Sequence, residues 1–164
     1  MSDARKHQVL AVTLLFVFAW HSASFAQSAP TRKTQVVMLG TGTPLPDPQR
    51  SGASTTIVVN DVPYIVDAGT GVVRRAAAAR DKGVKGLEPT NLRIAFLTHL
   101  HADHTLGLPD LILTPWIMGR KEPLELYGPV GTREMVANIL QAYDADIKRR
   151  EPKVWNTRTA LGAT

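Results

Sequence analysis

Three histidines and one aspartate lie within six consecutive residues, directly after an apolar segment that predicts a β-strand. The segment reads Thr98-His99-Leu100-His101-Ala102-Asp103-His104 and follows the run Ile-Ala-Phe-Leu. Side chains alternate between the two faces of an extended strand, so we expect His99, His101 and Asp103 to share one side. His104 joins them if the chain turns at that point, as the helical pattern after it predicts. The fold must therefore present four polar donors at the end of a strand.

Imidazole nitrogens and carboxylate oxygens are the donors that zinc and similar transition metals accept. A lone histidine more often satisfies hydrogen bonds in a core than it binds a metal, and that is the alternative interpretation of this cluster. Of the five histidines, however, only the three in this cluster lie beyond residue 26. The sequence therefore predicts a metal site formed by His99, His101, Asp103 and His104.

The first 26 residues have the layout of a secretory signal peptide. Arg5 and Lys6 give a positively charged start, Val9–Trp20 is an apolar run, and small residues precede the cleavage site expected after Ala26. About 12 apolar residues are too few for a helix to cross a bilayer core of roughly 30 Å, so we expect no stable membrane anchor. These features predict a periplasmic or secreted protein whose domain occupies residues 27–164.

Composition excludes several kinds of site. The 164 residues include no cysteine, which removes disulfide bonds, thiolate zinc sites and cysteine nucleophiles. The net charge of +5 is mild and spread along the chain, so it does not by itself indicate nucleic-acid binding. The chain has no P-loop and no Gly-x-Ser-x-Gly elbow, and Gly40-x-Gly42 lacks the third glycine of a dinucleotide fingerprint.

Apolar, β-branched segments alternate with helical ones, which is typical of an α/β or mixed layered fold. The predicted strands are Val36–Leu39 (read as buried), Thr55–Val59, Val62–Val66, Arg93–Thr98 and Leu124–Tyr127. Two helices are predicted at Val72–Arg80 and at Asp110–Met118, and Pro115 bends or ends the second. A third helix is capped by Thr132. Its apolar stripe is predicted to lie in the core and consists of Met135, Val136, Ile139, Leu140 and Tyr143. Asn60-Asp61 predicts a tight hairpin turn, and Pro63 predicts an edge strand or the start of a strand. From Asp144 the helical pattern fades, and Lys148–Arg150 reads as a solvated helix end.

The cluster resembles the signature of the metallo-β-lactamase fold, His-x-His-x-Asp-His. Five further segments accompany it in order along the chain: Leu39–Pro44, Val66–Gly71, Phe96–His99, Gly107–Pro109 and Tyr127–Gly131. Together they resemble the ribonuclease Z and arylsulfatase-like branch of that superfamily. The similarity runs from about Val36 to Tyr143.

The resemblance implies an αββα sandwich of two mixed sheets, with two zinc ions at one sheet edge. By analogy, His99 and His101 would hold one zinc, and Asp103 and His104 the other. A hydroxide bridging the metals would attack the substrate, and Asp103, the candidate catalytic residue, would orient it or pass on its proton. Asp67 would fix a ligand histidine, with capping of a glycine-rich turn as the alternative. Manganese or iron could replace zinc, because histidine and aspartate accept all three.

The family site also takes two further histidines and a bridging aspartate from a second half of the fold. No histidine follows His104, and Asp144 and Asp146 lie in a predicted helix end. The sequence therefore predicts only the amino-terminal half of the sandwich, truncated at its carboxyl end. We expect such a half to expose the apolar face of its sheet, which favours aggregation or pairing into a homo-oligomer.

Three functions are consistent with these features. The first is an exported, metal-dependent hydrolase of small sulfate or phosphate esters, as the arylsulfatase-like members are. The second is a transfer-RNA 3′-processing endoribonuclease, although export separates the chain from precursor transfer RNA. In addition, the loop Pro46–Ser51 keeps only Pro46 and Arg50 of that family's Pro-x-Lys-x-Arg-Asn motif, so nucleic acid is the less favoured substrate. The third is an inactive remnant with a partial metal site.

Ala102 stands where oxygen-reducing diiron relatives carry glutamate, which argues against redox chemistry.

Overall fold

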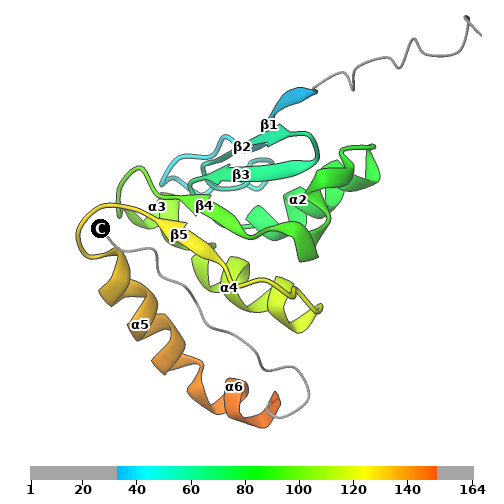
Figure 1. Ribbon diagram of the computed structural model, residues 1–164. Coiled ribbons are helices and arrows are strands. Elements are labelled where there is room, and N and C mark those ends of the chain that lie inside the picture. The colour runs from blue at the N-terminus through cyan, green and yellow to red at the C-terminus, as the bar shows by residue number, and fades with distance from the viewer. Residues whose placement is uncertain (1–32, 151–164) are drawn as a thin grey trace, which may run out of the picture. The chain divides into compact units, whose positions relative to one another are not determined.

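The computed structural model describes residues 33–150, which form one five-stranded mixed sheet with helices (Figure 1). The strands lie in the sheet in chain order: β1 (Thr34–Gly40), β2 (Ser54–Val59), β3 (Val62–Val66), β4 (Ile94–Phe96) and β5 (Glu125–Tyr127). The helices are α2 (Val72–Asp81), α3 (Ala102–Thr105), α4 (Leu108–Ile117), α5 (Thr132–Ala142) and α6 (Asp144–Arg150), with 3₁₀ turns at Lys85–Leu87 and Pro89–Asn91. No helix between residues 33 and 150 is long and apolar enough to cross a bilayer. The predicted signal peptide lies outside the described residues.

The sheet changes from antiparallel to parallel at β3. Strands β1, β2 and β3 form an antiparallel meander, and Asn60 (φ 50°) and Asp61 (φ 64°) make the predicted two-residue turn between β2 and β3. Strands β3, β4 and β5 are parallel, so each connection between them must cross over the sheet. The carboxyl ends of these three strands therefore meet at the same edge, where ligands commonly bind in such sheets.

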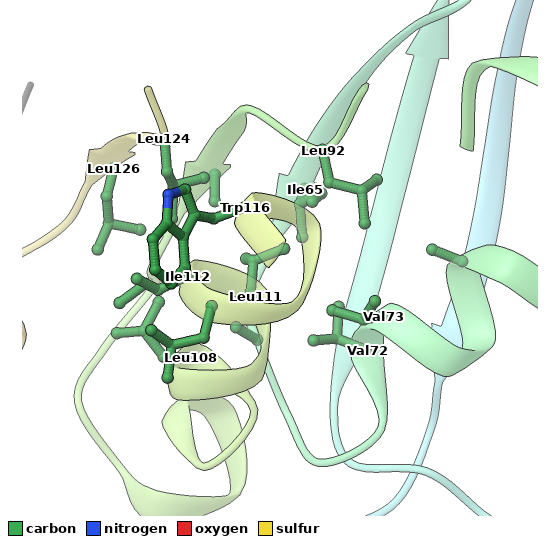
Figure 2. Packing of buried hydrophobic residues seen from close by; sticks show 14 of the residues in the cluster. Ile65, Val72, Val73, Leu92, Leu108, Leu111, Ile112, Trp116, Leu124 and Leu126 are labelled. Atoms are coloured by element: carbon green, nitrogen blue, oxygen red, sulfur yellow. The ribbon is translucent and has the colours of Figure 1, made fainter. Parts of the chain in front are cut away.

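Helices α2 and α4 bury one face of the sheet (Figure 1). Leu108, Leu111, Ile112 and Trp116 recur on one side of α4 at helical spacing and are all buried. They pack in the same cluster as Ile65 of β3, Leu124, Leu126 of β5 and the start of α2 (Figure 2). This core fixes the positions of β3 and β4, whose ends carry the candidate site.

Pro63 lies in the centre of the sheet and not at its edge, which corrects one of the two expectations for this residue. It is the second residue of β3, and β3 has β2 on one side and β4 on the other. The pairing with β4 begins only at Tyr64. The missing N–H of proline is therefore tolerated because Pro63 stands before the parallel ladder begins.

Helix α5 and the segment after it differ from the sequence expectations in three ways. Thr132 is the first helical residue, and Gly131, with φ 98°, occupies the capping position. Tyr143 is 43% exposed, so the apolar stripe of α5 ends one turn earlier, with Val136 buried and Ile139 half-buried. The chain also continues as α6 because Ile147 packs against the core, and the basic end of α6 is solvated as expected.

Arg120 is a buried cation that the sequence pattern did not single out. Its guanidinium donates to the carbonyl oxygens of Leu92 at 3.0 Å, Leu111 at 3.1 Å and Ile112 at 3.1 Å. Burial lowers the pKa of Arg120 to about 10, because the charged form loses its hydration. The side chain thus satisfies carbonyl groups of two segments, Leu111 and Ile112 within α4 and Leu92 before β4.

We expect Arg120→Met to lower the free energy of unfolding by about 2–4 kcal/mol, because it leaves buried carbonyl oxygens without a donor. Urea unfolding followed by circular dichroism measures the change. Arg133→Met, at an exposed position of α5, is the matched control and should change stability little. Equal losses in the two variants would contradict the role of Arg120.

The opposite face of the sheet is apolar and exposed. Val36 and Met38 of β1 are 66% and 59% exposed, and the stacked rings of Phe96 and Tyr127, with centroids 5.1 Å apart, are 38% and 40% exposed. The prediction that Val36–Leu39 is buried is therefore wrong for Val36 and Met38, whereas Leu39 is buried and Val37 is half-buried against the core. Strand β1 is an edge strand whose alternate side chains point to the uncovered face. The expectation of an exposed apolar sheet face is confirmed.

We expect this face to drive self-association of the chain in solution. Burying a methionine side chain contributes about 1.5–3 kcal/mol, so Met38→Lys should weaken association by roughly tenfold or more. Sedimentation velocity over a range of concentrations measures this. Val130→Lys changes a fully exposed apolar residue outside the sheet and is the control. A Met38→Lys chain that associates as strongly as the Val130→Lys chain would show that another surface is responsible.

Candidate metal centre

The histidine cluster lies where β4 gives way to α3, at the carboxyl ends of the parallel strands. Strand β4 ends at Phe96, His101 takes the capping position of α3, and Asp103 and His104 lie within that helix. The expected alternation along one strand is therefore not what brings these side chains together. A strand-to-helix turn does so, and it begins three residues before the predicted turn at His104.

Asp67 connects the histidine cluster to β4 through hydrogen bonds. Its Oδ1 accepts hydrogen bonds from the Thr98 backbone N–H at 2.8 Å and the Thr98 hydroxyl at 2.9 Å, and its Oδ2 lies 2.8 Å from His104 Nδ1. The residue is only 7% exposed and has φ 62°, a left-handed conformation that is uncommon outside glycine. The strained turn after β3 thus aims a buried carboxylate at both β4 and α3.

The hydrogen bonds fix which ring nitrogens carry protons. Because the Thr98 hydroxyl donates to Asp67, its oxygen can only accept from His99 Nδ1, which lies 2.9 Å away. Likewise His104 Nδ1 donates to the carboxylate of Asp67. Both neutral rings therefore hold their proton on Nδ1 and keep the lone pair on Nε2. A carboxylate or hydroxyl partner on the far nitrogen is the usual arrangement behind a metal-binding histidine.

The four predicted ligands lie close together. His99 Nε2 is 3.1 Å from His101 Nδ1, the ring centroids of His99 and His104 are 4.1 Å apart, and His104 Nε2 is 3.4 Å from Asp103 Oδ2. Even so, within residues 33–150 no group of three or more His, Asp or Glu side chains has an arrangement that could hold a metal ion.

Two of the ring nitrogens, His99 Nε2 and His101 Nδ1, contact each other. The lone pair on His99 Nε2 faces the His101 ring, so it is used in a hydrogen bond from His101. His101 is an exposed side chain at the N-cap of α3, and rotation of its ring would leave His99 Nε2 and one nitrogen of His101 able to bind a metal. The donor types therefore suit zinc, while the roles of His99, His101, Asp103, His104 and Asp67 stay predictions.

Two glycines let α3 approach the turn that carries Asp67. The Ala68 N–H donates to the His104 carbonyl and the Gly107 N–H donates to the Ala68 carbonyl, both at 2.8 Å. A Cβ on Gly107 would lie 2.1 Å from the Gly69 oxygen, and a Cβ on Gly69 would lie 2.7 Å from the Asp103 carbonyl oxygen of α3. The glycines of the family-like motifs are thus needed for backbone packing beneath the cluster.

Thr98 is the member of this network that the sequence analysis missed. The motif Phe96–His99 contains it without assigning it a role, but its hydroxyl and backbone N–H join Asp67 to His99. Its position directly before the first histidine was the available signal.

The family model of the metallo-beta-lactamase superfamily matches residues 47–162, a range that includes Asp67, Thr98 and the whole histidine cluster. The chain belongs to the metallo-beta-lactamase superfamily. The predicted α/β fold and the hydrolase lineage are confirmed. Members of this superfamily typically bind metal ions such as zinc.

The metallo-beta-lactamase relatives that match this chain include ribonuclease Z proteins. Ribonuclease Z of Mycobacterium marinum is 40% identical over 119 residues, and that of Mycolicibacterium paratuberculosis is 42% identical over the same length. Each alignment covers 71% of this chain and 40% of the relative. The chain therefore spans about 40% of the length of the curated relatives it matches.

Solved structures agree with this branch of the superfamily. The short form of human tRNase Z superposes with a TM-score of 0.58 and 28% identity, covering 68% of this chain and 40% of the human one. A long-form RNase Z from yeast gives a TM-score of 0.58 and 25% identity, covering 77% of this chain and 18% of the yeast one. These matches support the predicted resemblance to the ribonuclease Z branch and a sheet equivalent to one half of the sandwich.

Proposed function

We propose that this chain carries one half of a metal-dependent phosphodiesterase site and that its substrate is RNA, as for the ribonuclease Z relatives. The observation that carries the proposal is the pair formed by Asp67 Oδ2 and His104 Nδ1 at 2.8 Å, which leaves His104 Nε2 directed toward Asp103. The names of the matched relatives support RNA over the small sulfate esters favoured by the sequence analysis.

In this proposal some residues would bind the metal and others would orient those ligands. His99 Nε2, His104 Nε2 and the Asp103 carboxylate would hold the metal, together with His101 after its ring turns. A bound divalent cation supplies Lewis acidity toward the phosphoryl group and lowers the pKa of an attacking water. Asp67 and Thr98 keep the two imidazoles in the orientation that binding requires, and Asp103 Oδ2 would accept the proton of the water.

A second function is favoured by the loop before β2. Asp47 Oδ2 lies 3.3 Å from Arg50 Nε, so the cation that the loop retains already faces a carboxylate. This loop also lacks the lysine of the ribonuclease Z motif. A chain exported by residues 1–26 would act on small esters and not on precursor transfer RNA. The second candidate is therefore an exported phosphate or sulfate ester hydrolase.

The test compares three substrates with the purified chain in zinc or manganese. We expect cleavage of a precursor transfer-RNA transcript and of bis(4-nitrophenyl) phosphate, with little release of 4-nitrophenol from its sulfate. His104→Ala should lose this activity, whereas Arg133→Met, on the surface of α5, should keep it. Faster turnover of the sulfate would favour the second candidate. Metal binding without turnover of any substrate would identify an inactive remnant.

A further inference from the structure

A cavity of about 710 Å³ adjoins the candidate metal residues and has no assigned occupant. His101, Ala102 and Asp103 form one part of its wall, and the loop 42–50 forms another. This volume lies in the range of pockets that bind small organic molecules and exceeds what an inorganic phosphate needs. Any ester whose phosphorus lies at the histidine cluster would therefore extend a second group into this space.

Most of the cavity wall is apolar, although the cavity lies at the protein surface. Leu45 is 77% exposed and Leu106 is 62% exposed, and both line it, together with Pro44, Pro46 and Pro48. Solvent-exposed leucines that gather at a cavity with a few polar groups are typical of ligand contacts.

The loop is held in shape, so the wall is formed in advance of binding. The Gly42 N–H donates to the Ser51 carbonyl at 2.7 Å and closes the base of the loop. Within it, Asp47 Oδ1 accepts from the Gln49 N–H at 2.8 Å, and three prolines fix their own φ angles. A wall that is already ordered loses little conformational entropy when a ligand binds.

The charges at the cavity offset each other. Arg50 faces Asp47 with Nε and Oδ2 3.3 Å apart, and Asp103 belongs to the candidate metal cluster. The remaining wall therefore offers neither a free cation for a second phosphate nor a free anion for an amine. The group that best complements it is apolar and uncharged.

We propose that this cavity binds the aromatic ring attached to the reacting ester, with Leu45 and Leu106 as its apolar contacts. The inference rests on the proposed function, because the ester itself must lie at the histidine cluster. The ring is a nucleobase if the substrate is RNA and an aryl group if it is a small ester. The nucleobase and the aryl group are both uncharged aromatic rings.

Two uncharged probes, adenosine and benzamide, test the cavity without involving the metal. We expect the methyl resonances of Leu45 and Leu106 in ¹³C-labelled protein to shift on titration, and those of buried leucines such as Leu111 to stay in place. Binding of adenosine but not benzamide assigns the cavity to a nucleobase, and the reverse assigns it to an aryl group.

Leu106→Ser should weaken binding of the effective probe by roughly tenfold, because it removes most of one apolar contact. Val130→Ser, at an exposed apolar residue outside the cavity, is the matched control and should leave the affinity unchanged. Circular dichroism checks that both variants fold. Probes that leave the Leu45 and Leu106 methyl resonances in place, or equal weakening in both variants, would overturn the inference.

Phosphodiesters that carry either a methyl or a phenyl group separate this inference from the proposed function. If the chain cleaves the methyl phosphodiester and the phenyl phosphodiester at the same rate, the cavity proposal fails and the proposed function stands. If adenosine or benzamide binds at Leu45 and Leu106 while no ester is cleaved, the proposed function fails and the aromatic site stands.

Discussion

Gly107→Ala is expected to destabilise the whole domain by about 3 kcal/mol or more, because overpacking against atoms that cannot move aside is among the causes of large losses. An added Cβ would lie 2.1 Å from the Gly69 oxygen and 2.9 Å from the Ala68 oxygen, and neither is a flexible side-chain end that can move aside. The Gly107 N–H bond to the Ala68 carbonyl would also break. Thermal and urea unfolding measure the loss.

The matched control for this change is Gly83→Ala. Gly83 has φ 101°, so alanine there is strained, but nothing lies within 4 Å of its added Cβ. It should cost only about 1 kcal/mol, the penalty for placing a side chain in a left-handed conformation. If both variants lost the same stability, close packing beneath the histidine cluster would not be the reason for the glycine at position 107.

Asp67→Asn is expected to reduce zinc affinity by roughly 10- to 100-fold, the usual loss when the partner of a ligand histidine is removed. Asparagine keeps the size of the side chain and tolerates the left-handed backbone at φ 62°. If its amide N–H faces His104 Nδ1, that nitrogen must accept the hydrogen bond. The ring proton then moves to Nε2, which is the nitrogen expected to bind the metal.

Isothermal titration with zinc measures the affinity, and ¹⁵N NMR of the imidazole nitrogens reports the tautomer of His104. Asp144→Asn removes an exposed carboxylate that pairs with Lys148 on α6, so it should change neither readout. An Asp67→Asn chain that binds zinc as tightly as the parent would show that Asp67 caps a turn and does not support a ligand.

The features that the sequence predicted are mainly local ones. The hairpin turn at Asn60-Asp61 depends on two adjacent residues, and the helical stripe of α5 depends on spacing within one segment. The closeness of His99, His101 and His104 follows from their separation along the chain. The resemblance to a family added Asp67, whose neighbours lie 31 and 37 positions away.

The features that the sequence did not predict depend on contacts between distant segments. The exposure of Val36 and Met38 is set by the position of β1 at the sheet edge, with both side chains on the face opposite α2 and α4. Arg120 bonds to carbonyl oxygens on two other segments, so nothing beside it in the sequence indicates burial. Asp103 was expected in a strand-like alternation, with the turn only at His104, because a four-residue helix is too short to show a period.

The change of strand direction at β3 has a kinetic consequence. The antiparallel β2–β3 hairpin closes over two residues and can form within microseconds, whereas the β3–β4 pairing must wait for the crossover through α2. Asp67 ends the early hairpin, but Thr98 and His104 reach it only after that slower step. The zinc affinity that we propose for this cluster would therefore develop only after that slower step.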